Sequence, residues 1–135
     1  MPASTKLATA TYILSYVAVK APALVTTATI AKAVKEHPAR IRQIVAALVR
    51  AKLLRSVRGA RGGVTLGRPA ETISLRDICE AVEDQGLLTL TLKDPFSAWA
   101  DKCHVHPTLS KLYRDFEERM LVSLSDYRLS QMFTK

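Results

Sequence analysis

A chain of 135 residues with 48% hydrophobic and 24% charged residues has the composition of one globular domain with an appended element. This composition excludes a disordered or fibrous protein, and no apolar run approaches the roughly 20 residues of a membrane span. The net charge of +8 is unevenly placed, because residues 1–70 hold twelve Lys and Arg against one acid, whereas residues 71–135 hold eight against eleven. A local positive field suits a polyanionic partner, although a basic composition also serves solubility alone.

The N-terminus and the cysteine count predict where the protein works. Residues 1–20 lack the leucine-rich core and the small-residue cleavage site of a signal peptide. Two cysteines, Cys79 and Cys103, are too few for a disulfide framework. We therefore expect a soluble protein of the reducing cytoplasm with no membrane partner.

Three helices are predicted in the first fifty residues. The apolar residues of 7–19 predict a first helix that ends near Lys20, because Ala21-Pro22 disfavours its continuation. Thr26 or Thr27 caps a short second helix that stops ahead of Pro38. Pro38 suits the first position of a third helix, whose core stripe comprises Ile41, Ile44, Val45 and Leu48.

The opposite face of the third predicted helix is acid-free and consists of small and hydrogen-bonding residues. At about 100° per residue, that face holds Ala39, Arg42, Gln43, Ala46 and Arg50. Residues 55–57 and 64–66 then predict two strands joined by a Gly-rich turn that carries Arg58 and Arg61. Gly62-Gly63 is followed by neither a helix start nor a Lys-Ser/Thr pair, which argues against a nucleotide-binding loop.

The second half of the sequence predicts a short helix, an irregular stretch and a long helix. Ser74 and Asp77 match a capping box for a helix over residues 75–82. Residues 84–106 carry no regular pattern. Pro107 opens a final helix with an apolar stripe of about five turns, formed by Leu109, Leu112, Tyr113, Phe116, Met120, Leu124 and Tyr127.

This order predicts a mainly α fold with a small β-hairpin, in which a winged helix-turn-helix precedes a long C-terminal dimerisation helix. The expected units are a DNA-binding domain (1–83), an effector or sensing loop (84–106) and a dimerisation helix (107–135). In such a fold the third helix enters the major groove of DNA, where Arg and Gln read base edges, and the hairpin reaches the minor groove or its phosphates. The DNA-binding candidates are Thr27, Ala39, Arg40, Arg42, Gln43, Arg50, Arg58, Arg61, Gly62 and Gly63. Each of Arg40, Arg42 and Arg50, taken alone, is equally consistent with a solvated helix face.

Several runs of the sequence resemble the Rrf-two family of bacterial regulators, which includes IscR, NsrR and CymR. They are the segment from Ile30 to Ile44, the segment from Leu48 to Leu54, the hairpin from Ser56 to Leu66, and the helix from Ile73 to Glu83. Val64 stands where the family usually has an aromatic residue. The resemblance implies a homodimer held by the last helix, two helix-turn-helices on a palindromic operator, and an effector site in the segment before that helix.

The apolar stripe itself agrees with dimerisation, because it is longer than a domain of this size needs for its own core. We expect it to bury against a second copy through Leu109, Leu112, Tyr113, Phe116, Met120, Leu124 and Tyr127. Folding back onto the protein's own first helix is the alternative, and partial contact of that kind is compatible with a dimer.

The sequence is short of ligands for a metal or cluster. The family's iron-sulfur members usually use three cysteines before the last helix, whereas this segment offers Cys103, His104 and His106. Some members instead combine two cysteines with an acid and a His from the first helix of the partner subunit, but residues 1–20 contain no Asp, Glu or His. Those three residues are one ligand short of a zinc site. We therefore expect no cofactor and no metal. Cys103 remains a candidate redox sensor, with His104 beside it to lower its pKa, or else an inert thiol, and a small-molecule effector is the other candidate signal.

The sequence thus predicts a sequence-specific transcription regulator, a repressor in our interpretation, that binds duplex DNA as a homodimer. An enzyme is disfavoured because Cys103, His104 and His106 lack an orienting partner, so no catalytic residue is assigned. The better alternative is a winged-helix protein-protein interaction module without its own DNA binding. That alternative predicts acidic or apolar residues on the outer face of the third helix, and the sequence has neither there.

Overall fold

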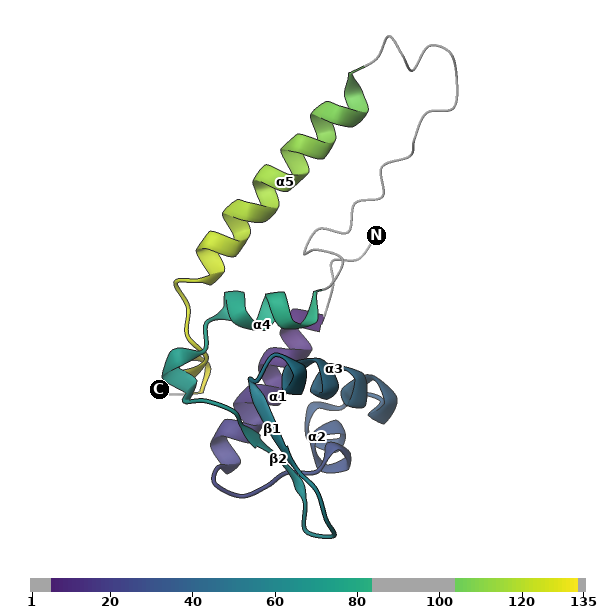
Figure 1. Cartoon of the computed structure of the whole chain (residues 1–135), viewed down its shortest axis with the longest axis vertical. Helices are drawn as coiled ribbons and strands as arrows, with labels where there is room; N and C mark the ends of the chain where they lie inside the picture. The colour runs from purple at the N-terminus through teal and green to yellow at the C-terminus, as the bar shows by residue number, and fades with distance from the viewer. Residues whose placement is uncertain (1–5, 84–103, 134–135) are drawn as a thin grey trace.

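Figure 1 shows the computed structural model, which describes residues 6–83 and 104–133. The elements in chain order are α1 (Lys6–Lys20), α2 (Thr27–Val34), α3 (Pro38–Arg50), β1 (Leu54–Val57), β2 (Gly63–Leu66), the 3-10 turn η1 (Ala70–Thr72), α4 (Leu75–Val82), α5 (Val105–Leu124) and the 3-10 turn η3 (Leu129–Met132). The predicted class, mainly helical with one hairpin, is confirmed. Within the described residues, no helix is long and apolar enough to cross a membrane.

Local sequence signals set the starts of α2 and α3. Thr26 is the N-cap of α2, and its hydroxyl oxygen accepts a hydrogen bond from the backbone N–H of Thr29 at 3.2 Å. Pro38 is the first residue of α3, as predicted, and follows the N-cap His37. The apolar faces of α1, α2, α3 and α4 meet in one core, whose members with no exposed surface include Ile13, Leu14, Ile30, Ile41, Leu48 and Ile78.

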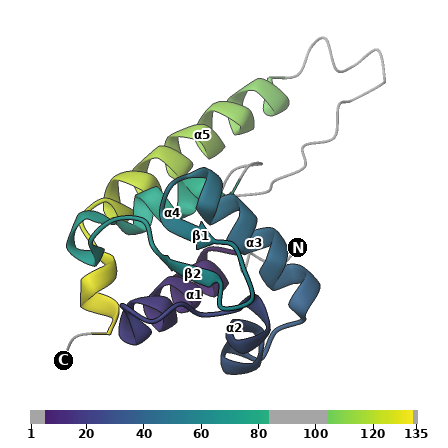
Figure 2. The ribbon, with the colours of Figure 1, turned by 60° about the horizontal axis from the view of Figure 1, so that its bottom comes forward.

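The hairpin is antiparallel and is anchored to the loop ahead of α2. Its register pairs Leu54 with Leu66 and Val57 with Gly63. Val25 adds a one-residue third strand, because Val25 and Val64 exchange two backbone hydrogen bonds of 3.0 and 2.8 Å. In Figure 1 α2 and the turn of the hairpin lie at the end of the molecule away from α5, and Figure 2 shows the same ribbon with that end turned forward.

The long helix differs from the prediction at both ends. It begins at Val105 rather than Pro107, so two residues of the predicted 84–106 loop belong to α5. A proline is tolerated there because the N–H groups of the first helical turn have no intrahelical partner. The helix ends at Leu124, so the prediction that the helical stripe continues to Tyr127 was wrong.

Beyond Leu124 the chain folds back onto residues 73–75 at the start of α4. The carbonyl oxygen of Tyr127 accepts a hydrogen bond from the backbone N–H of Leu75 at 2.9 Å, and the N–H of Leu129 donates to the carbonyl of Ile73 at 2.8 Å. Leu129 has no exposed surface and belongs to the same core as α1. Residues 125–133 therefore do not extend the long helix, in contrast to the predicted helical segment 107–135, and they secure its end to the core.

Candidate nucleic-acid interface

The outer face of α3 has the composition and exposure that the sequence predicts. Ile41, Ile44, Val45 and Leu48 are buried, whereas Ala39, Arg42, Gln43, Ala46 and Arg50 are all exposed. The helix contains no acidic residue, and its N-cap His37 accepts a hydrogen bond from the N–H of Ala39 at 3.1 Å through Nδ1. The positive end of the helix dipole is therefore not countered by a carboxylate in the first turn, which favours the approach of an anion.

Arg40 and Arg42 lie on opposite sides of α3. Side chains two positions apart on an α-helix are separated by about 200° around the helix axis, so residues 40 and 42 point in nearly opposite directions. Arg40 is half-buried and lines a cleft of about 240 Å³ together with Ala81 and Val82 of α4. Arg42 projects from the other side of α3 and is exposed. The structure therefore brings Gln43 and Arg50 together on the outer face and separates the two arginines that the sequence predicts as a group.

The wing, residues 58–62 between β1 and β2, presents two arginines on a tight turn. Arg58 and Arg61 are both exposed, and the N–H of Gly62 donates to the carbonyl of Gly59 at 2.9 Å. A Cβ at position 62 would collide with the carbonyl oxygen of Val57, and one at position 63 would lie 2.7 Å from the carbonyl oxygen of Val25. The close approach of backbone to backbone therefore requires glycine at both positions.

Thr27 is the first residue of α2 and is half-buried. Its neighbour Thr26 provides the cap, so of the two residues that the sequence leaves open for that role the structure selects Thr26. Thr27 therefore lies at the N-terminal end of α2 without serving as its N-cap.

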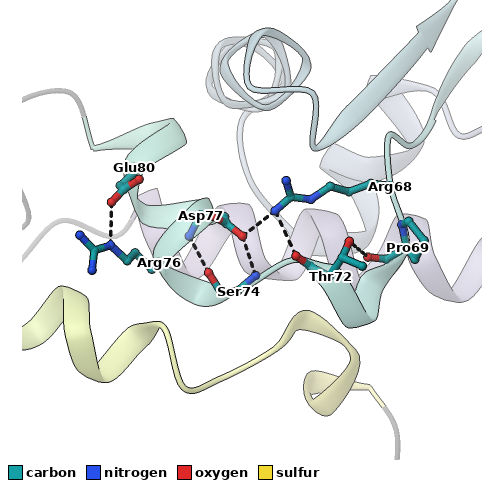
Figure 3. Close-up of polar contacts among 7 residues, drawn as sticks. All are labelled: Arg68, Pro69, Thr72, Ser74, Arg76, Asp77 and Glu80. Carbon is teal, nitrogen blue, oxygen red and sulfur yellow. Dashed lines mark hydrogen bonds and ion pairs between the residues drawn. The ribbon is translucent and has the colours of Figure 1, made fainter.

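A polar network joins the exit of the wing to α4 (Figure 3). Arg68 Nη2 donates to the carbonyl of Thr72 at 3.1 Å and to Asp77 Oδ2 at 2.5 Å. The same carboxylate oxygen accepts from the N–H of Ser74 at 2.9 Å and completes the predicted capping box. Burial raises the pKa of Asp77, but the hydrogen bonds from Ser74 and the charge of Arg68 outweigh it, and the pKa is lowered overall.

Helix α4 also contacts α5. Arg76 Nε donates to Glu80 at 2.8 Å, and its Nη2 lies 3.7 Å from a carboxylate oxygen of Glu118. The hydrogen bond from Arg76 to Glu80 raises the pKa of Arg76, and this effect is larger than the opposing effect of desolvation. Helix α4 therefore contacts both the residues that follow the wing and α5.

The apolar stripe of α5 is exposed in the single chain. Leu112, Phe116 and Met120 are 40%, 42% and 40% exposed. They are spaced four residues apart and therefore lie on one side of the helix. Leu109, Tyr113 and Leu124 flank them and are half-buried, whereas Tyr127, 52% exposed, lies beyond the helix. The sequence therefore located the stripe correctly on α5 but extended it too far.

Of the two cysteines, the structure describes Cys79 and leaves Cys103 outside its described residues. Cys79 is 2% exposed on α4, and burial, followed by the nearby charge of Glu83, raises the pKa of its thiol to about 11. The Cys79 thiol is therefore buried and remains protonated at neutral pH. Cys103, the redox candidate, lies outside the described residues, as does the side chain of His106, whereas His104 is the exposed N-cap of α5. Among the residues that the structure describes, no group of three or more His, Cys, Asp or Glu is arranged to hold a metal ion.

Two basic side chains of this end of the molecule were not predicted. Lys6, the first residue of α1, lines the same cleft as Arg40. Arg55 is exposed on β1, where only Leu54 of the four strand residues is buried. The alternation of buried and exposed residues along a hairpin strand could have predicted that Arg55 is exposed. No local pattern places residue 6 beside residue 40, because their proximity depends on how α1 packs against α3.

Comparison with known proteins assigns this architecture. The profile of the Rrf2 family, described as an iron-dependent transcriptional regulator, matches residues 3–135. Similar solved structures are T. potens IscR (24% identity, 98% of this chain and 85% of that one, TM-score 0.68), CymR of B. subtilis, described as its global cysteine regulator (23%, 100% and 99%, 0.70), and the oxidized form of Staphylococcus aureus CymR (26%, 100% and 98%, 0.71). With α2 and α3 as the helix-turn-helix and β1–β2 as the wing, the chain belongs to the Rrf2 family of winged-helix transcriptional regulators.

Proposed function

We propose that this protein binds specific duplex DNA sequences as a homodimer and represses transcription from them. The observation that carries the proposal is the exposed, acid-free outer face of α3 beside the arginine-tipped wing. A helix of about 10–12 Å diameter fits the major groove of B-DNA, which is about 12 Å wide. Gln43 and Arg50 then meet base edges, with Ala39 and Ala46 permitting close approach, while Arg58 and Arg61 contact the backbone or the minor groove.

The decisive experiment selects bound sequences from fragmented genomic DNA with the purified protein. We expect a palindromic consensus, because two copies related by a twofold axis read two equivalent half-sites. Gln43→Ala should relax the sequence preference, whereas an Arg58→Ala, Arg61→Ala variant should weaken binding to every duplex. A protein that retains no duplex at low salt would instead support the interaction module without its own DNA binding.

The homodimer rests on the α5 stripe. Three large apolar side chains at 40–42% exposure on one side of a helix are a surplus that a second copy of the same helix covers by symmetric packing. Sedimentation should show a dimer for the wild type and a monomer for Phe116→Asp. Val122→Asp is the matched control, because Val122 is 51% exposed on a different side of α5 and should leave the dimer intact. A wild-type monomer at micromolar concentration would refute this part of the proposal.

We also propose that the protein works without an iron-sulfur cluster, unlike the iron-dependent regulators after which its family is described. The described residues do not fit such a group, because Cys79 is buried with a raised pKa and α1 carries no acid or histidine. The whole sequence then leaves one cysteine, Cys103, and a cluster requires four donors. Anaerobic purification followed by iron analysis and a visible spectrum tests this, and near-stoichiometric iron would overturn it.

Any redox response is assigned to Cys103, with a small-molecule effector as the alternative signal. The support is chemical: the thiolate is the reactive form, and a pKa of about 11 keeps Cys79 protonated at neutral pH. Oxidant should alter operator binding by the wild type and by Cys79→Ser but not by Cys103→Ser. An equal response of Cys103→Ser would remove the thiol switch and leave the effector.

A further inference from the structure

Two exposed lysines, one at each end of α3, occupy a backbone conformation that favours glycine. Lys35 has a φ of 58° and Lys52 a φ of 64°, both in the left-handed region. Lys35 directly follows α2, and the N–H of Glu36 donates to the carbonyl of Ala31 at 3.1 Å and closes that helix. Glycine is the usual residue at such a position, because a Cβ crowds the following carbonyl oxygen there. A strained residue of this kind suggests a function for its side chain.

The two lysines differ in their position relative to the proposed DNA-binding surface. Lys35 lies in the turn between α2 and α3, just ahead of the end of α3 that enters the major groove in the proposed complex. Lys52 lies between α3 and β1, at the end of the hairpin opposite to the wing turn (Figure 1). In a helix-turn-helix the first helix crosses the DNA backbone and the second enters the groove, so the turn between them passes the edge of the groove. The proposed complex therefore brings Lys35, and not Lys52, close to a sugar-phosphate strand.

The charge of Lys35 is exposed and is not used within the described part of the chain. In residues 6–83 and 104–133, Lys35 takes part in none of the ion pairs. The one acid of this turn, Glu36, is half-buried, and the first turn of α3 carries no carboxylate. A lysine ammonium group has three donors and binds phosphate as a point charge, with release of condensed counterions. A backbone phosphate at the groove edge is therefore a suitable partner.

We infer that Lys35 contacts a phosphate of the DNA backbone at the edge of the major groove that α3 enters. This inference rests on the proposed DNA-binding function and adds a residue that the sequence did not suggest. The contact explains why a lysine occupies a position that favours glycine. A backbone contact carries no direct sequence information. Loss of Lys35 should therefore reduce affinity by one factor on all duplexes, whereas loss of a base contact should change the ranking of sequences.

The test measures binding of operator and of an unrelated duplex as a function of salt for Lys35→Gly. Lys52→Gly is the matched control, because it also removes one exposed positive charge and also places glycine in a left-handed conformation. Lys35→Gly should bind both duplexes more weakly by the same factor, and the slope of log K against log salt should fall in magnitude by about 0.9. Its loss of affinity should then shrink roughly threefold between 50 and 200 mM salt. Lys52→Gly and the charge-retaining Lys35→Arg should keep the wild-type slope.

Urea denaturation separates the contact from folding. Both glycine variants should unfold at a midpoint no lower than that of the wild type, because glycine relieves the left-handed strain, and a lower midpoint for Lys35→Gly would assign its side chain to structure and overturn the inference.

Three other outcomes are decisive. A wild-type slope for Lys35→Gly, or an equal loss of slope in both glycine variants, would overturn the inference and leave the proposed function standing. A loss that disappears in a Glu36→Gln background would show that Lys35 only screens the neighbouring carboxylate, and would also overturn the inference. A wild-type protein that binds no duplex would refute the proposed function itself.

Discussion

Removing the Asp77 carboxylate should destabilise the protein measurably at neutral pH. Asp77→Ala deletes the acceptor for the N–H of Ser74 at 2.9 Å and for Arg68 at 2.5 Å. Ser74 remains the N-cap of α4 in this variant, and the loss of the reciprocal hydrogen bond to the Asp77 carboxylate costs about 0.5–1.5 kcal/mol. The Arg68 pair adds about 0.2–1 kcal/mol, at the low end because both side chains are about 40% exposed. We expect the free energy of unfolding to fall by roughly 1–2 kcal/mol.

Urea denaturation at one fixed protein concentration measures this change, because the proposed dimer makes apparent stability depend on concentration. Glu80→Gln is the control, since it removes the negative charge from the exposed Arg76 pair at 2.8 Å without touching the capping box, and it should cost about 0.5 kcal/mol or less. An Asp77→Ala variant no less stable than Glu80→Gln would refute the assignment of the network as structural.

The pH dependence follows from the direction of the pKa shift. The folded-state pKa of Asp77 is lowered, so its contribution is fully present above the unfolded value of about 3.9 and is lost as the pH falls through the lower folded value. The stability difference between wild type and Asp77→Ala should therefore be constant from about pH 7 to pH 5 and shrink below about pH 4. A difference that persists unchanged at pH 2 would show that the carboxylate charge is not its source.

Three other substitutions or measurements test separate parts of the structure. Leu129→Ala should lower the free energy of unfolding by about 2–5 kcal/mol in urea denaturation, because Leu129 has no exposed surface, and a loss below about 1 kcal/mol would show that the C-terminal turn is not part of the core. Gly62→Ala should weaken duplex binding in a fluorescence titration while sedimentation stays unchanged, since the added methyl collides with the Val57 carbonyl at the wing turn, and wild-type affinity would contradict that geometry. Cys79 should resist alkylation at pH 8 in the native protein and react in urea, because burial raises its pKa to about 11, and rapid native labelling would contradict its placement.

The sequence was sufficient for the fold wherever a local signal decides the structure. Pro38 at the first position of α3, the capping box of Ser74 and Asp77, and the Gly-rich turn of the wing each depend on residues within a few positions of one another. The core stripe of α3 follows from helical periodicity, and so does the exposure of the face opposite it.

The structure differs from the prediction where contacts between distant segments of the chain determine the local conformation. The apolar period of α5 continues to Tyr127, but the helix stops at Leu124 because Tyr127 and Leu129 form backbone hydrogen bonds with Leu75 and Ile73. No short-range signal announces those partners, which lie some fifty positions earlier. The placement of Arg40 in a cleft with Lys6 depends likewise on the packing of α1 and α4 against α3.

The attachment of α5 has a consequence for how a dimer would read DNA. Its C-terminal end is held to the core by Leu129 and by the hydrogen bond from Leu75 to Tyr127, and its side contacts α4 through Arg76 and Glu118. Because α4 in turn packs on α3, a continuous set of contacts connects α5 with α3, and we expect a rotation of α5 to be transmitted along it. In the proposed dimer, the separation of the two α3 helices would thus depend on the packing of the two α5 helices. Half-sites are read about one DNA turn apart, or multiples of it, so a signal that repacks α5 would change operator affinity without touching a DNA-contacting residue.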